Sequence, residues 1–304
     1  MRNKIILGLI MSLFLNYNIF AQEAPIQEEK PKPSLGLSVQ PGGILIQHVK
    51  LGETYDLYEK SGIALIIENK DIRPHTYILT TFKPSQVGNK KWLKGYSEIP
   101  ESGWFWFEKD EVRVEPQSRQ EVKMYLKIPQ EDKYYNQHWT VSLGVAGKPE
   151  TGETLTLAVY PRYQIETEGR AGLKEKPDGL IGLEPSKVSF ENLALGKKEE
   201  AKVIIYNNDE KVHKYKIIPQ VVEVDSAREQ IVASPGYSWI PNKKWIRPGK
   251  RRLKIKPGET GELIITVKIP QSEKYSGKKW EALIFVEDEE GLSGFVRMQI
   301  ETNK

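Results

Sequence analysis

The chain has 304 residues, of which 28% are charged, and its formal net charge at pH 7 is +4. It contains no cysteine, which excludes disulfides, thiolate metal sites, thiol catalysis and the attachment cysteine of a lipoprotein. Aliphatic and aromatic residues are plentiful, so the composition is typical of a folded protein with a wet surface. The mildly basic charge favours anionic partners only weakly.

The N-terminal residues 1–21 are predicted to be a secretory signal peptide. Arg2 and Lys4 precede an apolar stretch at residues 5–15, which is too short to span a bilayer comfortably. No later stretch is long and apolar enough to do so. We therefore expect an extracytoplasmic protein, periplasmic or secreted, with no membrane span after signal cleavage. Residues 22–33, QEAPIQEEKPKP, are predicted to be a flexible tether.

The rest of the chain contains the same module twice. Residues 95–139 match residues 236–280 without a gap, and the sequence KIPQ occurs at equivalent places in both. We predict a first repeat at residues 34–168 and a second repeat at residues 178–304. The residues between them, 169–177, are rich in Gly, Pro and charge and are predicted to be a linker.

Each repeat is predicted to consist of short β-strands. Apolar residues recur at every second position in stretches such as KYKIIPQVVEV (214–224) and ELIITVKIP (262–270), and turn residues separate these stretches. No stretch keeps a helical period over a useful length. About seven strands in each repeat favour an antiparallel sandwich, with a small closed barrel as the alternative.

Two segments of the second repeat carry a resemblance to known families. The opening, GLEPSKVSFENLALGKKEEAKVIIYNND, resembles immunoglobulin-like domains of the PapD-like, major-sperm-protein and ASPM-SPD-2-Hydin type. The later LKIKPGETGELIITVKIPQ resembles the immunoglobulin-like domains of bacterial WxL-interacting proteins, although the transmembrane helix and basic tail of those proteins are missing. The resemblance implies an all-β fold of two tandem antiparallel immunoglobulin-like β-sandwiches. The Arg and Lys clamp of pilus chaperones matches no motif in this chain.

The stretch ESGWFWFEKD (101–110) places four aromatic residues in a row. The second repeat keeps apolar residues at the first two places, but it has Arg247 and Pro248 where the first repeat has Trp106 and Phe107. The first two aromatic residues are therefore interpreted as scaffold, whereas the last two are free to serve a function. In a regular strand these two side chains point to opposite faces.

Two interpretations of this aromatic pair are open. Trp106 and Phe107 either pack against the other repeat or the extra residues 53–62, or form a platform for a glycan or a partner's apolar edge. Tyr134 and Tyr135 belong to the same candidate binding site if they cluster with Trp106.

The segment KKWIRPGKRRLKIK (243–256) contains no acidic residue, whereas the matching segment of the first repeat is mixed to acidic. It is a candidate patch for an anionic polymer or an acidic partner, and secretion makes nucleic acid an unsuitable ligand. The alternatives are a solvated hairpin whose charges suppress edge pairing, and repeats of opposite charge that stack head to tail. The patch consists of Lys243, Lys244, Arg247, Lys250, Arg251 and Arg252.

The sequence offers little for catalysis. It has no nucleophile elbow, phosphate loop or dinucleotide motif, and no pair of histidines at metal-ligand spacing. His75 and His213 occupy equivalent places, which predicts a packing or hydrogen-bonding role. Sandwiches of this size usually lack the deep cleft that general acid–base catalysis needs. We therefore expect neither an enzyme nor a bound metal or cofactor.

These observations together predict a non-catalytic binding or structural protein of the cell envelope or of a surface assembly. Its expected partners are envelope or surface proteins, or an anionic or neutral cell-surface polysaccharide. Two alternatives are a carbohydrate-binding protein that uses the aromatic residues of the first repeat, and a periplasmic PapD-like chaperone for surface subunits. A long, unprotected apolar edge strand would favour the chaperone.

Overall fold

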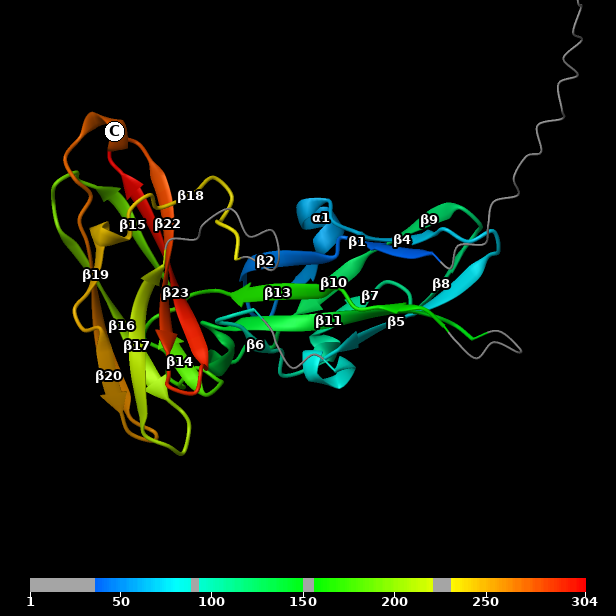
Figure 1. The fold of residues 1–304 in the computed structure, drawn as a ribbon, viewed down its shortest axis with the longest axis horizontal. Helices are drawn as coiled ribbons and strands as arrows, with labels where there is room; N and C mark the ends of the chain where they lie inside the picture. The colour runs from blue at the N-terminus through cyan, green and yellow to red at the C-terminus, as the bar shows by residue number, and fades with distance from the viewer. Residues whose placement is uncertain (1–35, 89–92, 150–155, 221–230) are drawn as a thin grey trace, which may run out of the picture. The chain divides into compact units, whose positions relative to one another are not determined.

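The computed structural model describes residues 36–88, 93–149, 156–220 and 231–304, and these residues are mostly β-structure (Figure 1). The predicted signal peptide and tether lie outside them. Every strand pairing among the described residues joins strands of the same repeat. None of the described helices has the length and apolar character that a membrane crossing needs. The boundary between the repeats stays a prediction, because contacts gather residues 34–304 into one compact unit.

The first repeat contains thirteen of the described strands and four short helical segments. The strands are β1 (Leu37–Gln40), β2 (Gly43–Val49), β3 (Thr54–Asp56), β4 (Leu65–Asn69), β5 (His75–Phe82), β6 (Ser97–Glu98), β7 (Phe105–Phe107), β8 (Glu111–Val114), β9 (Ser118–Val122), β10 (Met124–Lys127), β11 (His138–Gly147), β12 (Ala158–Val159) and β13 (Arg162–Thr167). The helical segments are α1 (Leu57–Ser61) and the 3-10 turns η1 (Pro84–Val87), η2 (Ser102–Trp104) and η3 (Asp132–Tyr134). One layer has the strand orders β1-β4-β9 and β3-β10-β7, and the other has β2-β13-β11-β5-β8, with β6 and β12 beside β11.

The second repeat contains ten of the described strands and two 3-10 turns. The strands are β14 (Ile181–Glu184), β15 (Lys187–Leu193), β16 (Glu199–Asn207), β17 (His213–Gln220), β18 (Ser238–Trp239), β19 (Ile246–Pro248), β20 (Arg252–Ile255), β21 (Thr260–Val267), β22 (Lys279–Glu287) and β23 (Ser293–Thr302). The turns are η4 (Lys243–Trp245) and η5 (Glu273–Tyr275). One sheet has the order β14-β16-β21-β19, and the other has β15-β23-β22-β17-β20 with β18 beside β22.

The strand order is that of an immunoglobulin-like sandwich. The sheet β14-β16-β21-β19 corresponds to strands A, B, E and D of that fold, and β17, β22 and β23 correspond to C, F and G. The chain crosses between the sheets at β19 and β20, because β19 pairs with β21 whereas β20 pairs with β17. The predicted all-β sandwich fold is confirmed. The pairings of β2 with β13 and of β15 with β23 are parallel.

The core of each repeat lies between its sheets, because apolar side chains alternate along the strands. In β21, Leu263, Ile265 and Val267 are buried, and the residues between them are partly exposed. Successive side chains of a strand point to opposite faces, so this alternation directs one face to the core. Burial of each such side chain contributes about 1.5–3 kcal/mol.

The extra residues of the first repeat interrupt a strand. Eight residues separate Asp56 from Leu65, whereas two separate their counterparts, Glu200 and Val203, in the continuous strand β16. The insertion contains α1, whose first turn is capped because Asp56 Oδ1 accepts hydrogen bonds from two backbone amides. The sheet is therefore divided into two parts in the first repeat.

Candidate functional site

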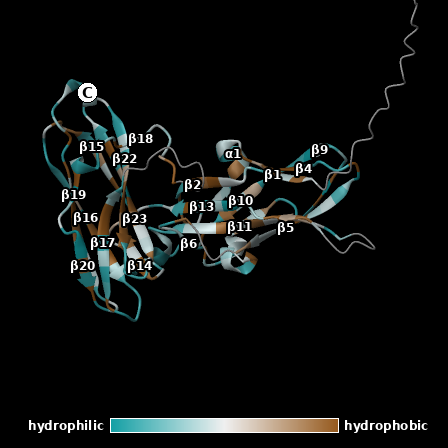
Figure 2. Cartoon of the chain, in the orientation of Figure 1, coloured by the Kyte–Doolittle hydropathy of each residue, from teal (hydrophilic) through white to brown (hydrophobic). Residues whose placement is uncertain are grey.

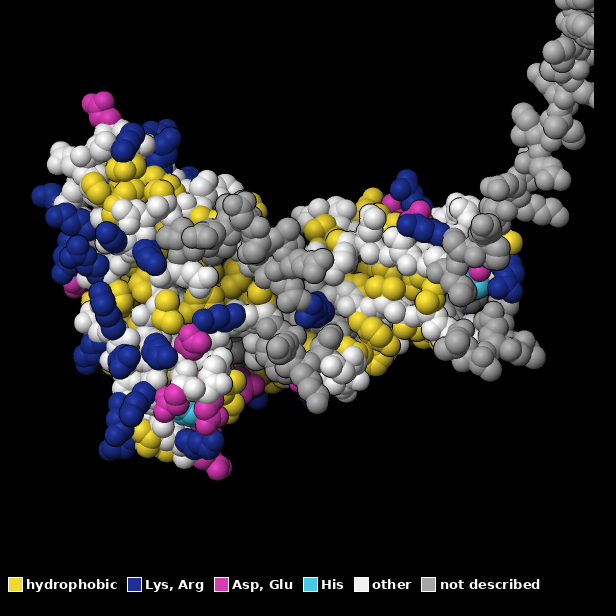
Figure 3. Space-filling view, in the orientation of Figure 1, with side chains coloured by type: hydrophobic (Ala, Val, Ile, Leu, Met, Phe, Trp, Pro, Cys, Tyr) yellow, Lys and Arg dark blue, Asp and Glu magenta, His cyan; other side chains and the backbone are white. Residues whose placement is uncertain are grey.

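The predicted basic patch lies on one side of the second repeat. Its six residues lie in η4, β19, β20 and the connection between these strands, and all six are exposed. Figure 2 colours much of this side hydrophilic, and Figure 3 shows Lys and Arg side chains gathered over it. None of the six forms an ion pair with a carboxylate among the described residues. The next ion pair along the chain lies in the turn after β20, where Lys256 Nζ is 3.4 Å from Glu259.

The outward direction of part of this patch follows from the alternation in β20. Leu253 and Ile255 are buried in the core, so Arg252 and Lys254 point to solvent. β20 is the last strand of its sheet, and charges on such an edge discourage pairing with another chain. Edge protection is therefore one physical reason for cations on β20.

The structure adds two cations that the sequence analysis missed. β20 pairs with β17 so that Lys254 lies opposite Lys214, and Arg252 lies opposite Lys216. Like charges directly opposite in a sheet destabilise the pair. The spacing of Lys214 and Lys216 in the sequence indicates that they share a face, but only the pairing with β20 shows what lies beside them. We call these four residues the β17–β20 ribbon.

The aromatic run alternates between core and surface. Phe105 and Phe107 are buried in the core of the first repeat, and Trp106 between them is 37% exposed. The Trp106 ring stacks on Tyr125 of β10, with ring centroids 5.6 Å apart and an angle of 17° between the rings. Of the two aromatic residues predicted to be free for function, only Trp106 is therefore on the surface.

Tyr134 and Tyr135 are also buried, and among the described residues neither ring stacks on Trp106, whose ring contact is with Tyr125. Tyr134 packs against Trp104 and Trp139, with ring centroids 4.9 and 5.9 Å apart. The same arrangement recurs in the second repeat, where Tyr275 packs against Trp245 and Trp280 at 4.8 and 5.7 Å. Such recurrence indicates a role in the scaffold.

The two equivalent histidines hold turns in place. His75 Nε2 lies 2.8 Å from Asp71 Oδ2, and His213 Nε2 lies 2.7 Å from Asp209 Oδ2. These hydrogen bonds hold the pKa of each aspartate below its usual value. The predicted hydrogen-bonding role is confirmed. Among the described residues, no three His, Asp or Glu side chains are arranged to hold a metal ion.

A buried ion cluster joins the two repeats. Arg297 of β23 is 1% exposed, and its Nη atoms lie 2.5 Å from Glu166 of β13 and 2.7 Å from Glu281 of β22. Tyr96 donates a hydrogen bond of 2.6 Å to Glu166. Burial by itself would lower the pKa of Arg297 and raise that of Glu166. The attraction between the two opposite charges outweighs this effect, so the pKa of Arg297 is raised and the pKa of Glu166 is lowered.

The fold and this surface define an all-β protein of immunoglobulin-like sandwiches with an exposed basic patch. No protein-family model matches the chain, and no curated protein does either. A protein of unknown function from Porphyromonas gingivalis shares 15% identity over 87% of this chain and 99% of its own, with a TM-score of 0.30.

Two further solved structures are similar to the chain at a comparable level. The E. coli chaperone DraB shares 12% identity over 88% of this chain and 98% of its own, with a TM-score of 0.29. The PapD-like domain 7 of human CEP192 shares 13% identity over 52% of this chain and 97% of its own, with a TM-score of 0.28. At these identities and TM-scores the likeness carries no argument about function.

Proposed function

We propose that this protein is a non-catalytic, extracytoplasmic binding protein that holds an anionic component of the cell envelope on the basic patch of its second repeat. The observation that carries the proposal is the absence of any carboxylate partner for the six exposed cations within the described part of the chain. Uncompensated positive charge raises the local concentration of anions and speeds their association. The signal-like N-terminal sequence supports the location.

The proposal is tested by capture on purified envelope polysaccharides. We compare the wild-type chain with a variant in which all six patch residues are changed to Gln. The wild type should retain an anionic polymer at low salt and release it as the salt concentration rises, because salt screens exposed charges. The patch variant should retain at least tenfold less.

The control variant carries the same loss of charge elsewhere on the surface. Six exposed lysines outside the patch are changed to Gln: Lys174, Lys176, Lys197, Lys268, Lys274 and Lys278. This control should keep most of the binding. If the control and the patch variant lose binding equally, net charge alone attracts the polymer and the proposed site is wrong.

A chaperone for surface subunits is the second candidate function. The edge strand β2, GILIQHV, carries Ile44, Leu45 and Ile46 without a Lys, Glu or Pro, and among the described strands it pairs only with β13. An apolar edge strand can accept a strand from a partner. Arg297, however, does not serve as the arginine of a pilus-chaperone clamp, because it is buried and its guanidinium already binds two carboxylates of this chain. Capture of a surface protein by both wild type and patch variant, without any polymer, would favour this second function.

A further inference from the structure

We infer that the anionic partner is a linear polymer with a phosphate in every repeat unit, and that it lies along the β17–β20 ribbon. This inference rests on the proposed function and narrows it to one chemical class and one line of contact. The ribbon consists of Lys214 and Lys216 on β17 and of Arg252 and Lys254 on β20, in opposed pairs.

The ribbon forms two parallel rows of positive charge. Outward residues of one strand repeat about every 7 Å, and neighbouring strands lie about 5 Å apart. Lys250 and Arg251 precede Arg252, and Lys256 follows Lys254, so exposed cations continue beyond both ends of the paired segment. A line of charge with a regular spacing suits a polymer that lies along it better than a single small anion.

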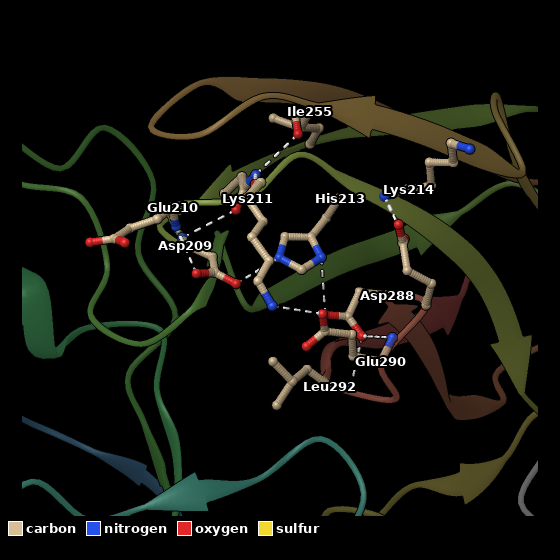
Figure 4. A network of polar contacts seen from close by, with 11 residues as sticks. Asp209, Glu210, Lys211, His213, Lys214, Ile255, Asp288, Glu290 and Leu292 are labelled. Atoms are coloured by element: carbon tan, nitrogen blue, oxygen red, sulfur yellow. Dashed lines mark hydrogen bonds and ion pairs between the residues drawn. The ribbon is translucent and has the colours of Figure 1, made fainter.

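Two aspartates in the turns beside Lys214 bind other groups of the chain (Figure 4). Asp209 binds the His213 ring at 2.7 Å, and Asp288 Oδ1 accepts the backbone N–H groups of Glu290 and Leu292, each at 2.9 Å. Figure 4 shows the Lys214 ammonium directed away from this cluster, toward β20.

The two glutamates of the turn between β22 and β23 also bind other groups of the chain. Glu289 accepts the backbone N–H of Lys214 at 2.7 Å, so it fixes the start of β17 without binding the ammonium. Glu290 pairs with Lys211 at 3.0 Å. In the described part of the chain, no carboxylate therefore lies within ion-pair distance of the Lys214 ammonium, although its charge helps to lower the pKa of Glu289.

Lys216 is in the same situation for a different reason. Its neighbour across the sheet on the other side is Glu287 of β22. Glu287 pairs instead with Lys94 of the first repeat, with 2.9 Å between Nζ and Oε2. Lys216 therefore faces Arg252 on one side and a carboxylate that another lysine already holds on the other.

The fold itself does not require these cations. In the first repeat, the equivalent strands β5 and β8 place Thr76 opposite Arg113 and Ile78 opposite Glu111, which gives no net charge. β17 also lies between β22 and β20, so its lysines do not protect a sheet edge. A ligand explains the opposed cations where edge protection does not.

Phosphate is the anion that this combination of side chains suits. The planar guanidinium of Arg252 can donate two parallel hydrogen bonds to one phosphate, and the lysines supply compact charges beside it. A phosphodiester chain carries one charge in every repeat unit and can follow a row of closely spaced cations. A uronic acid polysaccharide also carries one charge in every repeat unit, but it places each carboxylate on a rigid sugar ring, whereas a phosphodiester carries its charge in the flexible backbone itself.

The test measures the affinity of the full chain for a lipid-free glycerol-phosphate polymer, for polygalacturonate with the same number of charges, and for glycerol phosphate. The wild type should bind the phosphate polymer at least tenfold more tightly than the other two. Lys214→Gln with Lys216→Gln should weaken that binding about tenfold. It should also lower the slope of log K against log salt by about 1.5, because each phosphate contact contributes about 0.7–0.9 to that slope.

The matched control is Lys274→Gln with Lys278→Gln, which removes the same charge from exposed positions outside the ribbon. An equal loss in this control would overturn the ribbon as the site. Equal affinity for polygalacturonate would overturn the phosphate class, and equal affinity for glycerol phosphate would overturn the linear arrangement, while the proposed function would stand in both cases. If the wild type binds neither polymer, the inference and the proposed function both fail.

Discussion

Trp106 and Phe107 are adjacent in the sequence but have opposite environments. Phe107 is 6% exposed and belongs to the core of the first repeat, whereas Trp106 is on the surface and stacks on Tyr125. The comparison of the repeats correctly marked Trp104 as scaffold, because its contacts with other aromatic residues recur around Trp245. It could not separate Trp106 from Phe107, because both differ from their counterparts.

These two residues should respond differently to truncation. Phe107→Ala should lower the free energy of unfolding by about 3–5 kcal/mol, because it leaves a cavity in the core. Trp106→Ala should lower it by only about 1 kcal/mol, which corresponds to the lost stacking on Tyr125. Urea denaturation of both variants measures the difference. Equal losses would mean that Trp106 is part of the core.

The same pair of variants decides whether Trp106 holds a sugar. Trp106→Ala keeps the core intact, so a loss of binding to a neutral polysaccharide in this variant alone would establish the carbohydrate platform. If wild type and Trp106→Ala bind such a polysaccharide equally, or not at all, Trp106 has no part in glycan binding. Phe107 is unsuitable for this test because its substitution damages the fold.

At the level of elements, the strands were predictable and their partners were not. A period of two in the sequence is a local property, and it identifies the strands that carry Lys214, Lys216 and Lys254. The pairing of β17 with β20 joins residues about forty positions apart, and no local pattern contains that information. The short helix α1 was also missed, because five residues are too few to show a helical period.

The opposed cations of the ribbon should cost stability. Lys254→Gln removes the repulsion from Lys214, and β20 has no described strand on its other side, so this change should raise the free energy of unfolding by about 0.2–1 kcal/mol at low salt. The gain should shrink in high salt, because exposed charges are screened. Thermal or urea denaturation at two salt concentrations measures it, with Lys278→Gln as the control. A loss of stability in Lys254→Gln at low salt would contradict the repulsion.

Such a gain would have a functional meaning. A residue that lowers stability but remains in the sequence is typical of a binding site, where activity and stability conflict. Lys254→Gln should therefore be more stable and bind the phosphate polymer less well.

For the molecule as a whole, both repeats contain an equivalent Tyr–Glu hydrogen bond, but its surroundings differ between them. Tyr96 donates a hydrogen bond to Glu166 in the buried ion cluster that joins the repeats, which we call the junction. The equivalent Tyr237 donates a hydrogen bond of 2.5 Å to Glu301 in the second repeat. The cation beside Glu166 is the buried Arg297, whereas the cation beside Glu301 is the exposed Lys279. Removal of Arg297 would leave the buried carboxylates of Glu166 and Glu281 without their ion-pair partner, so the contact between the repeats depends on this arginine.

His138 should make the stability of this junction depend on pH. Burial lowers the pKa of His138 to about 4, and its ring stacks on Phe295 with 3.8 Å between ring centroids. An unfolded histidine has a pKa of about 6.5, so between pH 6.5 and pH 4 the unfolded state binds more protons than the folded state. The stability that neutral His138 contributes is therefore complete above about pH 6.5 and is lost as the pH falls toward about 4.

This loss is measured by urea denaturation at pH 7 and pH 4.5. The contribution of His138 to the slope should reach at most about 1.4 kcal/mol per pH unit. His138→Phe keeps a ring against Phe295 and cannot titrate, so its stability should fall less over the same range. Apart from Glu166, whose pKa responds to the charge of His138, the aspartates and glutamates contribute equally to both proteins. If the two pH profiles are parallel, His138 is not the group responsible.

The sequence by itself determined the properties that depend on composition and local order. The absence of cysteine, the internal repeat, the alternation of apolar residues and the cations of residues 243–256 are all readable without a structure. Tertiary structure decided which strand lies beside which, and hence that Lys214 and Lys216 join the cations of β20 and that Arg297 binds Glu166. The physical reason is that the period of a strand is set by neighbours in the chain, whereas its register is set by packing between residues far apart.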